Sequence, residues 1–191
     1  MPAFRAGSWA RALLCGGVLV LAIMTTFANA LDNGFVYDDQ LLIVDDPAVR
    51  LPLSAGFEGL YYRPLRTLSY RLDYALGGMD PHVFHLSNVI YHAAAGLTVL
   101  ALLGAIGASS PAALAGALVF AVHPVQADAV SYAAGRRDVL CGLFYALGVV
   151  AYLRYRRGGG AAALVLAAGA YVLAILAKEM FGLKFQVVTG Y

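Results

Sequence analysis

The stretch "LSNVIYHAAAGLTVLALLGAIG", residues 86–107, decides the fold class, because it contains no Asp, Glu, Lys or Arg. A helix needs about 20 consecutive apolar residues to cross a bilayer. We expect four further spans at about residues 9–30, 111–123, 139–153 and 161–177. The 191-residue chain is 61% hydrophobic and 13% charged, unlike a soluble domain. The sequence predicts an all-α, polytopic transmembrane helical bundle that forms a single membrane domain over residues 1–191.

The first apolar run has two interpretations. It is long enough to be an uncleaved membrane anchor, and further spans follow it, which favours that interpretation. The alternative is a cleavable signal peptide, with Arg5 and Arg11 as its basic region and Ala28-Asn29-Ala30 as its cleavage site.

Residues 31–84 carry most of the acidic side chains and little continuous apolar sequence, so we expect them to form a large first extracytoplasmic loop. Eight of the eleven acids of the chain lie here. Within the loop, Pro64 is expected to start a helix, since Leu65, Leu68, Leu72 and Leu76 recur at helical spacing. This pattern is typical of an interfacial helix that lies on the membrane, although an ordinary loop helix would show the same periodicity.

The positive-inside rule predicts the topology. Arg5 and Arg11 precede the first span, and Arg154, Arg156 and Arg157 follow the fourth, so an even number of crossings puts both clusters in the cytoplasm. The acidic loop, residues 123–138 and Lys178 then face outward. The net charge is only +2, and nothing in the sequence suggests a nucleic-acid partner.

The start of the second span, "FHLSNVIYH", carries a polar stripe. His85, Asn88 and His92 fall on one side of a helix, where they are expected to face a bundle interior or a wet cavity. Interhelical hydrogen bonds are the simplest role for Asn88 and His92. A metal site made of Asp80, His82 and His85 is a weak alternative, and we predict no metal ligands.

Two charged groups are candidates for chemistry. Asp38 and Asp39 follow the first span closely, so one carboxylate can act as a base while its neighbour orients the acceptor; they can equally be solvated loop acids. The cationic side chains predicted on the same side can hold an anion such as a lipid-linked phosphate, or can pair locally, as in Arg137 with Asp138 and Lys178 with Glu179. This cationic group comprises His123, Arg136, Arg137 and Lys178.

Taken in order, several stretches resemble the transmembrane and tetratricopeptide-repeat-containing protein O-mannosyltransferases, a family of the GT-C superfamily of polytopic glycosyltransferases. They are "FVYDD", "YYRPLRTLSYRLDYALGG", "HVFHLSNVIYH", "LVFAVHPVQADAVSYAAGRRDVLCGLFY" and "LAKEM". The resemblance covers about residues 10–180, as the N-terminal membrane portion of such an enzyme. It implies transfer of a sugar, typically mannose, from a polyprenyl-phosphate donor to a protein hydroxyl on the extracytoplasmic side.

The resemblance also implies roles for individual residues. Asp38 or Asp39 would be the general base on the acceptor hydroxyl, with Asp38 preferred because it matches the first acid of the related Asp-Glu pair. Arg136, Arg137 and Lys178 would bind the donor phosphate, and His85, Asn88 and His123 would line the cavity. The second acid is Asp39 rather than Glu, which leaves the division of roles open. No cofactor follows from the residues, and the need for a divalent cation is undecided.

The resemblance implies a multi-pass membrane protein of the inner (plasma) membrane, if the source is bacterial, with the active site outside the cytoplasm. Its partners would be the lipid-linked sugar, a polypeptide acceptor and the bilayer. The family usually has more spans and helical repeats, so we expect this chain to be an incomplete fragment that lacks part of the donor site. The alternative function is a non-catalytic membrane scaffold or transporter subunit, in which the polar stripe lines a solute path. The sequence fixes neither the acceptor, nor the sugar, nor the oligomeric state.

Overall fold

The computed structural model describes residues 7–56 and 63–178, and these residues form helices and loops without a strand. The predicted all-α class is confirmed. Arg5, Glu58 and Glu179, which entered the sequence interpretation, lie outside the described residues.

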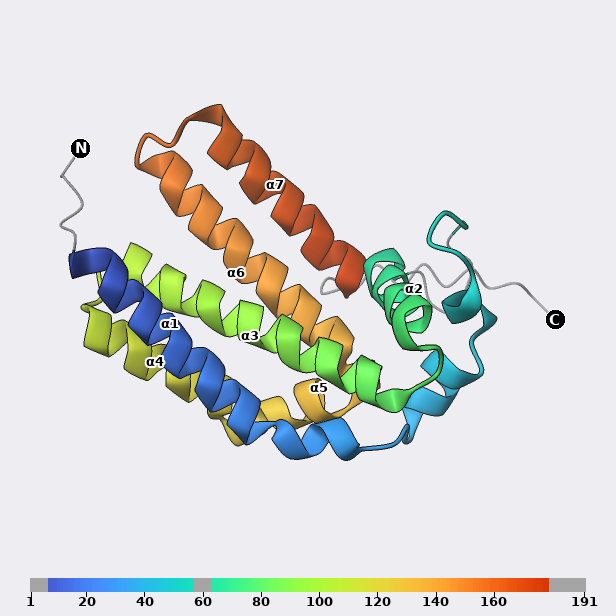
Figure 1. Cartoon of the computed structure of the whole chain (residues 1–191). Helices are drawn as coiled ribbons and strands as arrows, with labels where there is room; N and C mark the ends of the chain where they lie inside the picture. The colour runs from blue at the N-terminus through green and yellow to red at the C-terminus, as the bar shows by residue number, and fades with distance from the viewer. Residues whose placement is uncertain (1–6, 57–62, 179–191) are drawn as a thin grey trace.

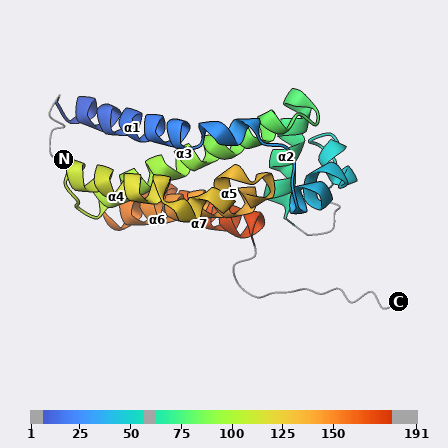
Figure 2. The ribbon, with the colours of Figure 1, turned by 90° about the horizontal axis from the view of Figure 1, so that it is seen from below.

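Five long helices build the bundle. They are α1 (Gly7–Thr26), α3 (Pro81–Ala105), α4 (Ser110–Val122), α6 (Arg136–Arg156) and α7 (Gly160–Ala177). The central helix is α3, which packs against α1, α4 and α6, while α7 packs along α6. Figure 2 shows α1 and α7 on opposite sides of α3. The apolar stretch that opened the sequence interpretation therefore lies within the central helix of the fold.

In the described part of the chain, α1, α3, α6 and α7 are long and apolar enough to cross a membrane. The shorter α4 joins a bent continuation over residues 124–131, which includes α5 (Ala127–Ser131), and the two pieces meet at 48°. Pro124 explains the break, because proline has no N–H for the helix ladder and disfavours a helical conformation of His123 before it. The bundle thus has four or five candidate spans.

The connections gather at one end of the bundle. Successive long helices run in opposite directions, so residues 27–56, residues 63–80, residues 123–135 and Lys178 meet where α2 and α5 lie in Figure 1. We call these residues the polar end. The opposite end carries the α3–α4 turn and the α6–α7 turn with its arginines. This arrangement brings together the same segments that the charge pattern assigned to one side of the membrane.

Helix α2 (Pro64–Gly77) begins at the predicted proline, but its burial is inverted relative to a soluble amphipathic helix. The side chains of Leu72 and Leu76 are 41% and 72% exposed, whereas Arg66, Arg71 and Asp73 are buried. Arg71 donates hydrogen bonds to the carbonyl oxygens of nearby loop residues, which compensates its burial. The leucine face turned outward is the orientation that contact with a bilayer requires.

Candidate functional site

The two neighbouring acids of "FVYDD" lie in different environments. Asp38 is exposed, while Asp39 is fully buried. Tyr37, just before them, has a φ of 48°, which residues other than glycine rarely adopt, and its side chain is 89% exposed. Only one of the two predicted carboxylates therefore faces solvent.

Asp39 ties the loop after α1 to the segment before α6. Its carboxylate accepts hydrogen bonds from the backbone N–H of Val36 at 3.1 Å and of Ala134 at 2.6 Å. Burial raises the pKa of Asp39, although these two N–H groups and the nearby His85 partly oppose the rise. The contacts give Asp39 a structural role across 95 residues of sequence.

Asp38 lines an open cavity of about 1000 Å³ at the polar end. Tyr132 and Arg137, which are far from Asp38 in the sequence, line the same cavity. The phenol oxygen of Tyr132 accepts a hydrogen bond of 2.6 Å from the backbone N–H of Asp38, which fixes the position of the acid. The backbone of Asp38 is thus held in place, and its carboxylate can serve as a base in a cavity large enough for a sugar.

The cations predicted to bind phosphate separate into two groups. Arg137 and Lys178 both approach Asp138: Arg137 Nε lies 3.5 Å from a carboxylate oxygen, and Lys178 Nζ pairs with the other. All three side chains are partly exposed, and Arg137 lines the cavity with Asp38. The expected pairing of Arg137 with Asp138 is present, and the cluster still carries one positive charge beyond its carboxylate.

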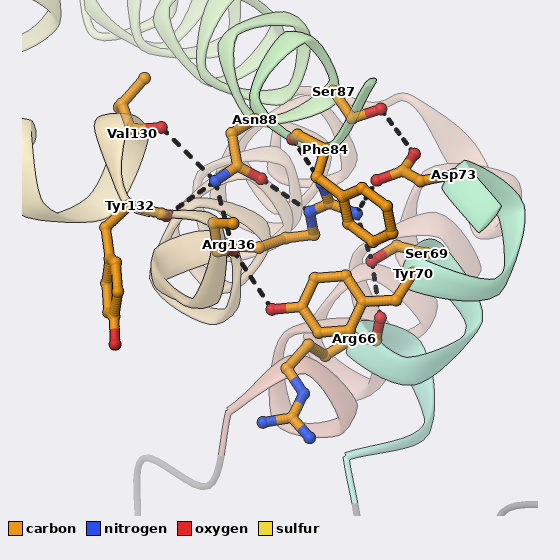
Figure 3. A network of polar contacts seen from close by, with 11 residues as sticks. Arg66, Ser69, Tyr70, Asp73, Phe84, Ser87, Asn88, Val130, Tyr132 and Arg136 are labelled. Atoms are coloured by element: carbon orange, nitrogen blue, oxygen red, sulfur yellow. Dashed lines mark hydrogen bonds and ion pairs between the residues drawn. The ribbon is translucent and has the colours of Figure 1, made fainter. Parts of the chain in front are cut away.

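Arg136 occupies the core instead. Its guanidinium pairs with Asp73 of α2 and donates hydrogen bonds of 2.7 Å to Asn88 Oδ1 and to the carbonyl oxygen of Phe84 on α3 (Figure 3). Both charged side chains are fully buried, and Ser87 also donates to Asp73. Burial raises the pKa of Asp73, and the Arg136 charge opposes that rise. Arg136 therefore joins α2, α3 and α6, and its charge is already matched.

Asn88 and His92 make the interhelical hydrogen bonds expected of them. Asn88 Nδ2 donates to the carbonyl oxygen of Tyr132 at 3.0 Å, and His92 Nε2 lies 2.8 Å from the carbonyl oxygen of Ala121. The stripe on α3 faces the bundle interior, as predicted, because both side chains are buried there.

His85 and His123, the other predicted cavity residues, differ in burial. His85 is fully buried, and neither of its ring nitrogens has a hydrogen-bond partner within the described residues. His123 is exposed at the end of α4, where its Nδ1 accepts a hydrogen bond from Val125 N–H at 3.1 Å. Across residues 7–56 and 63–178, no three His, Cys, Asp or Glu side chains come together to hold a metal ion.

The sequence interpretation missed Tyr132 and Asp73. Tyr132 touches Asp38 across 94 residues, and Asp73 meets Arg136 from another helix. A tyrosine just before "GRRD" and an acid on an amphipathic helix are common features, so no local signal distinguishes them. Only the packing of α2, α3 and α6 reveals their contacts.

The chain is similar to curated proteins that are named protein O-mannosyl-transferases. It is 44% identical to tmtc2 of Xenopus laevis over 94 residues, which are 49% of this chain and 11% of the relative. It is 32% identical to human TMTC4 over 177 residues, which are 76% of this chain and 23% of the relative. It is 41% identical to mouse TMTC2 over 148 residues, which are 69% of this chain and 18% of the relative. The chain thus spans less than a quarter of the length of these relatives, and neither a family model nor a solved structure matches it.

Proposed function

Because the chain belongs to the family of protein O-mannosyl-transferases represented by these relatives, we propose that it forms the acceptor-activating part of a glycosyltransferase. The donor is a sugar, mannose in the first instance, on a polyprenyl phosphate, and the acceptor is a protein hydroxyl on the extracytoplasmic side. The observation that carries this proposal is the cavity shared by the exposed Asp38 and the cationic Arg137.

In the proposed reaction, Asp38 on one side of the cavity activates the acceptor, and the cations on the other side stabilise the leaving phosphate. Asp38 takes the proton of the acceptor hydroxyl, whose oxygen attacks the anomeric carbon of the sugar. The bond between that carbon and the phosphate oxygen breaks, and the polyprenyl phosphate leaves with the electron pair. Attack opposite the phosphate inverts the anomeric centre.

The cations stabilise the leaving group. Charge grows on the phosphate as the bond breaks, and a guanidinium held nearby lowers the energy of that state. The place of Arg137 on the cavity that Asp38 also lines supports this role, and Lys178 is connected to Arg137 through Asp138. Arg136 contributes indirectly, by fixing the start of α6, where Arg137 follows it.

Mannose transfer from a polyprenyl-phosphate donor to a serine- and threonine-containing peptide tests the proposal. We expect Asp38→Asn to lower the rate about 100-fold or more, the usual contribution of a general base. Asp128→Asn is the matched control, because Asp128 is an exposed acid on the same cavity, and it should retain most of the rate. The same substitution in a full-length relative repeats the test with all membrane spans present.

Equal rates for the parent chain and Asp38→Asn would refute the role of Asp38. A transporter or scaffold function would instead predict that Asp38→Asn is neutral. Within the polar stripe of α3, Asn88 and His92 are engaged in internal hydrogen bonds, so the stripe gives little support to a solute path.

A further inference from the structure

Helix α2 carries a buried cation, Arg66, that has no ion pair within residues 7–56 and 63–178. Arg66 is 1% exposed, and its Nε and Nη1 have no hydrogen-bond partner among the described residues. A buried guanidinium without an anion is costly, much more so than an unpaired neutral group. Among the residues that the structure describes, the donors of this cation are therefore available to an anionic ligand.

Comparison with Arg136 makes the contrast clear, because the two guanidiniums approach the same aromatic ring. Arg136 Cζ lies 4.7 Å from the centre of the Tyr70 ring and Arg66 Cζ 5.7 Å from it. In Figure 3, Arg136 lies on one side of Tyr70 among its dashed contacts, and Arg66 extends away on the other. Arg136 has Asp73 as its counter-ion, whereas Arg66 has no ion pair in the described part of the chain.

The surroundings of Arg66 add positive potential. Burial lowers the pKa of Arg66, and the nearby charges of Arg63 and Arg137 lower it further. The charge of Asp46 opposes this lowering of the pKa, but its carboxylate already accepts a hydrogen bond from Ala48 N–H. In addition, Arg137 Nε is buried and makes no hydrogen bond, since its approach to Asp138 at 3.5 Å is an ion pair only. Two guanidinium groups therefore have unused donors in one region.

The start of α2 favours an anion in the same place. Arg66 lies in the first turn of this 14-residue helix, Pro64 occupies its start, and the side chain of the residue before Pro64 makes no capping hydrogen bond. Helical side chains lean toward the N-terminus, so the Arg66 guanidinium and the positive end of the helix dipole coincide. Free N–H groups and a guanidinium form the donor set that phosphate oxygens prefer.

We infer that Arg66, with Arg137 and the N-terminus of α2, forms a binding site for a phosphate group. The inference deepens the proposed function, because it assigns the phosphate of the donor to a residue outside the cation set considered from the sequence. The same helix also lines a groove of about 350 Å³, which begins at Leu65, the residue before Arg66 in the sequence, and is lined almost wholly by apolar side chains such as Leu68 and Leu72. This groove favours a phosphate that carries an isoprenyl chain over a free phosphate ion.

The test measures phosphate binding to the full chain in detergent, through the shift in thermal unfolding midpoint (Tm). The probes are farnesyl phosphate, farnesol and inorganic phosphate, each titrated separately. We expect farnesyl phosphate to raise Tm and farnesol to have little effect. A response to inorganic phosphate alone would assign the site to a soluble anion, and equal shifts with farnesol and farnesyl phosphate would overturn the inference.

The decisive variant is Arg66→Gln, which removes the charge and keeps polar donor groups. It should weaken farnesyl phosphate binding about tenfold or more, the loss of one charged hydrogen-bond partner. It should also leave the Tm of the ligand-free protein unchanged or higher, because an unmatched buried charge is removed. A merely structural arginine would show the opposite pattern, with a lower Tm and unchanged affinity.

Two further variants complete the design. Arg66→Lys keeps the charge and loses the bidentate donor geometry, so it should bind farnesyl phosphate with intermediate affinity. It replaces Arg66→Gln in the test if that variant does not fold. Arg154→Gln removes an exposed arginine at the opposite end of the bundle and should bind like the parent chain. The binding assay contains neither sugar nor acceptor, so it is independent of the transfer assay. Phosphate binding without mannose transfer would refute only the proposed function. Mannose transfer together with undiminished farnesyl phosphate binding by Arg66→Gln would refute only this inference.

Discussion

Asp38 and Asp39 are adjacent in the sequence but have different roles. Asp38 faces the cavity and is held by Tyr132, while Asp39 is buried and bonded to two backbone N–H groups. A buried carboxylate that already accepts two hydrogen bonds has little freedom to reach a substrate. The exposed acid is therefore the better candidate base, and the buried one positions it.

The buried state of Asp39 should appear in the pH dependence of stability. Its pKa is raised above the ordinary 3.8, so the folded protein holds this proton to higher pH than the unfolded chain does. The contribution of Asp39 to the free energy of unfolding is fully present below pH 3.8, and it is lost as the pH rises through the raised pKa. Thermal unfolding between about pH 4 and 8 should show a steeper decline for the parent chain than for Asp39→Asn. Parallel curves would mean that the pKa of Asp39 is not raised.

The Arg136–Asp73 pair should dominate the local stability, because both charges are fully buried. Asp73→Asn leaves the guanidinium without a counter-ion and should lower the free energy of unfolding by about 3–5 kcal/mol, measured by titration with a denaturing detergent. The double variant Arg136→Met with Asp73→Leu should recover much of that loss, since no unmatched charge remains. Asp138→Asn, at a partly exposed pair, should cost about 1 kcal/mol or less.

At the scale of elements, α2 determines the character of the polar end. Its polar side chains meet Arg136 and the backbone of residues 48–56, while Leu72 and Leu76 are exposed. The helix therefore connects the first loop to the bundle through hydrogen bonds and a buried ion pair. Apolar contacts add to this connection, because Tyr70 belongs to a buried cluster with Phe84 and Leu65 packs against α6 and α7. Because Arg66 and Asp73 both belong to it, α2 couples the proposed phosphate site to the core.

The turn before α6 depends on a glycine for close packing. A Cβ at Gly135 would lie 2.5 Å from the Asp128 carbonyl oxygen and 2.7 Å from that of Ala129, and these backbone atoms cannot move without shifting α5. We expect Gly135→Ala to destabilise the protein by about 1–3 kcal/mol and to impair mannose transfer, because Arg137 lies two residues away. Gly142→Ala is the control: no atom lies within 4 Å of its Cβ, and alanine should stabilise α6 slightly. Equal effects of the two substitutions would exclude this packing role.

At the scale of the whole molecule, the alternating helices place all proposed site residues at one end of the bundle (Figure 1). The arginines of the last turn of α6, Arg154 and Arg156, and the following Arg157 lie at the other end. The positive-inside rule assigns those arginines to the cytoplasm, and hence the polar end to the opposite side.

Labelling with a membrane-impermeant maleimide tests this orientation, in a chain whose Cys15 and Cys141 are replaced by serine. Tyr37→Cys, at an 89% exposed position of the polar end, should react in intact cells. Ser109→Cys, at the exposed turn between α3 and α4, should react only after the membrane is opened. The reverse labelling pattern would put the cavity in the cytoplasm and would be incompatible with an extracytoplasmic transfer reaction.

The sequence by itself determined the helical class, the start of α2 at Pro64 and the inward orientation of Asn88 and His92. These features follow from length, periodicity and the cost of polar groups in hydrocarbon, all of which act within one segment. The family resemblance likewise rests on residues that can be read in order along the chain.

Only the tertiary structure decided which charged residues face the cavity. Asp38 and Asp39 are chemically equal neighbours, as are Arg136 and Arg137, and nothing in their spacing tells the exposed member from the buried one. The choice depends on partners 94 residues away for Asp38 and on another helix for Arg136. The physical reason is that a charge is stable in the interior only where a distant segment supplies its counter-ion or hydrogen bonds, and such partners are fixed by packing rather than by local sequence.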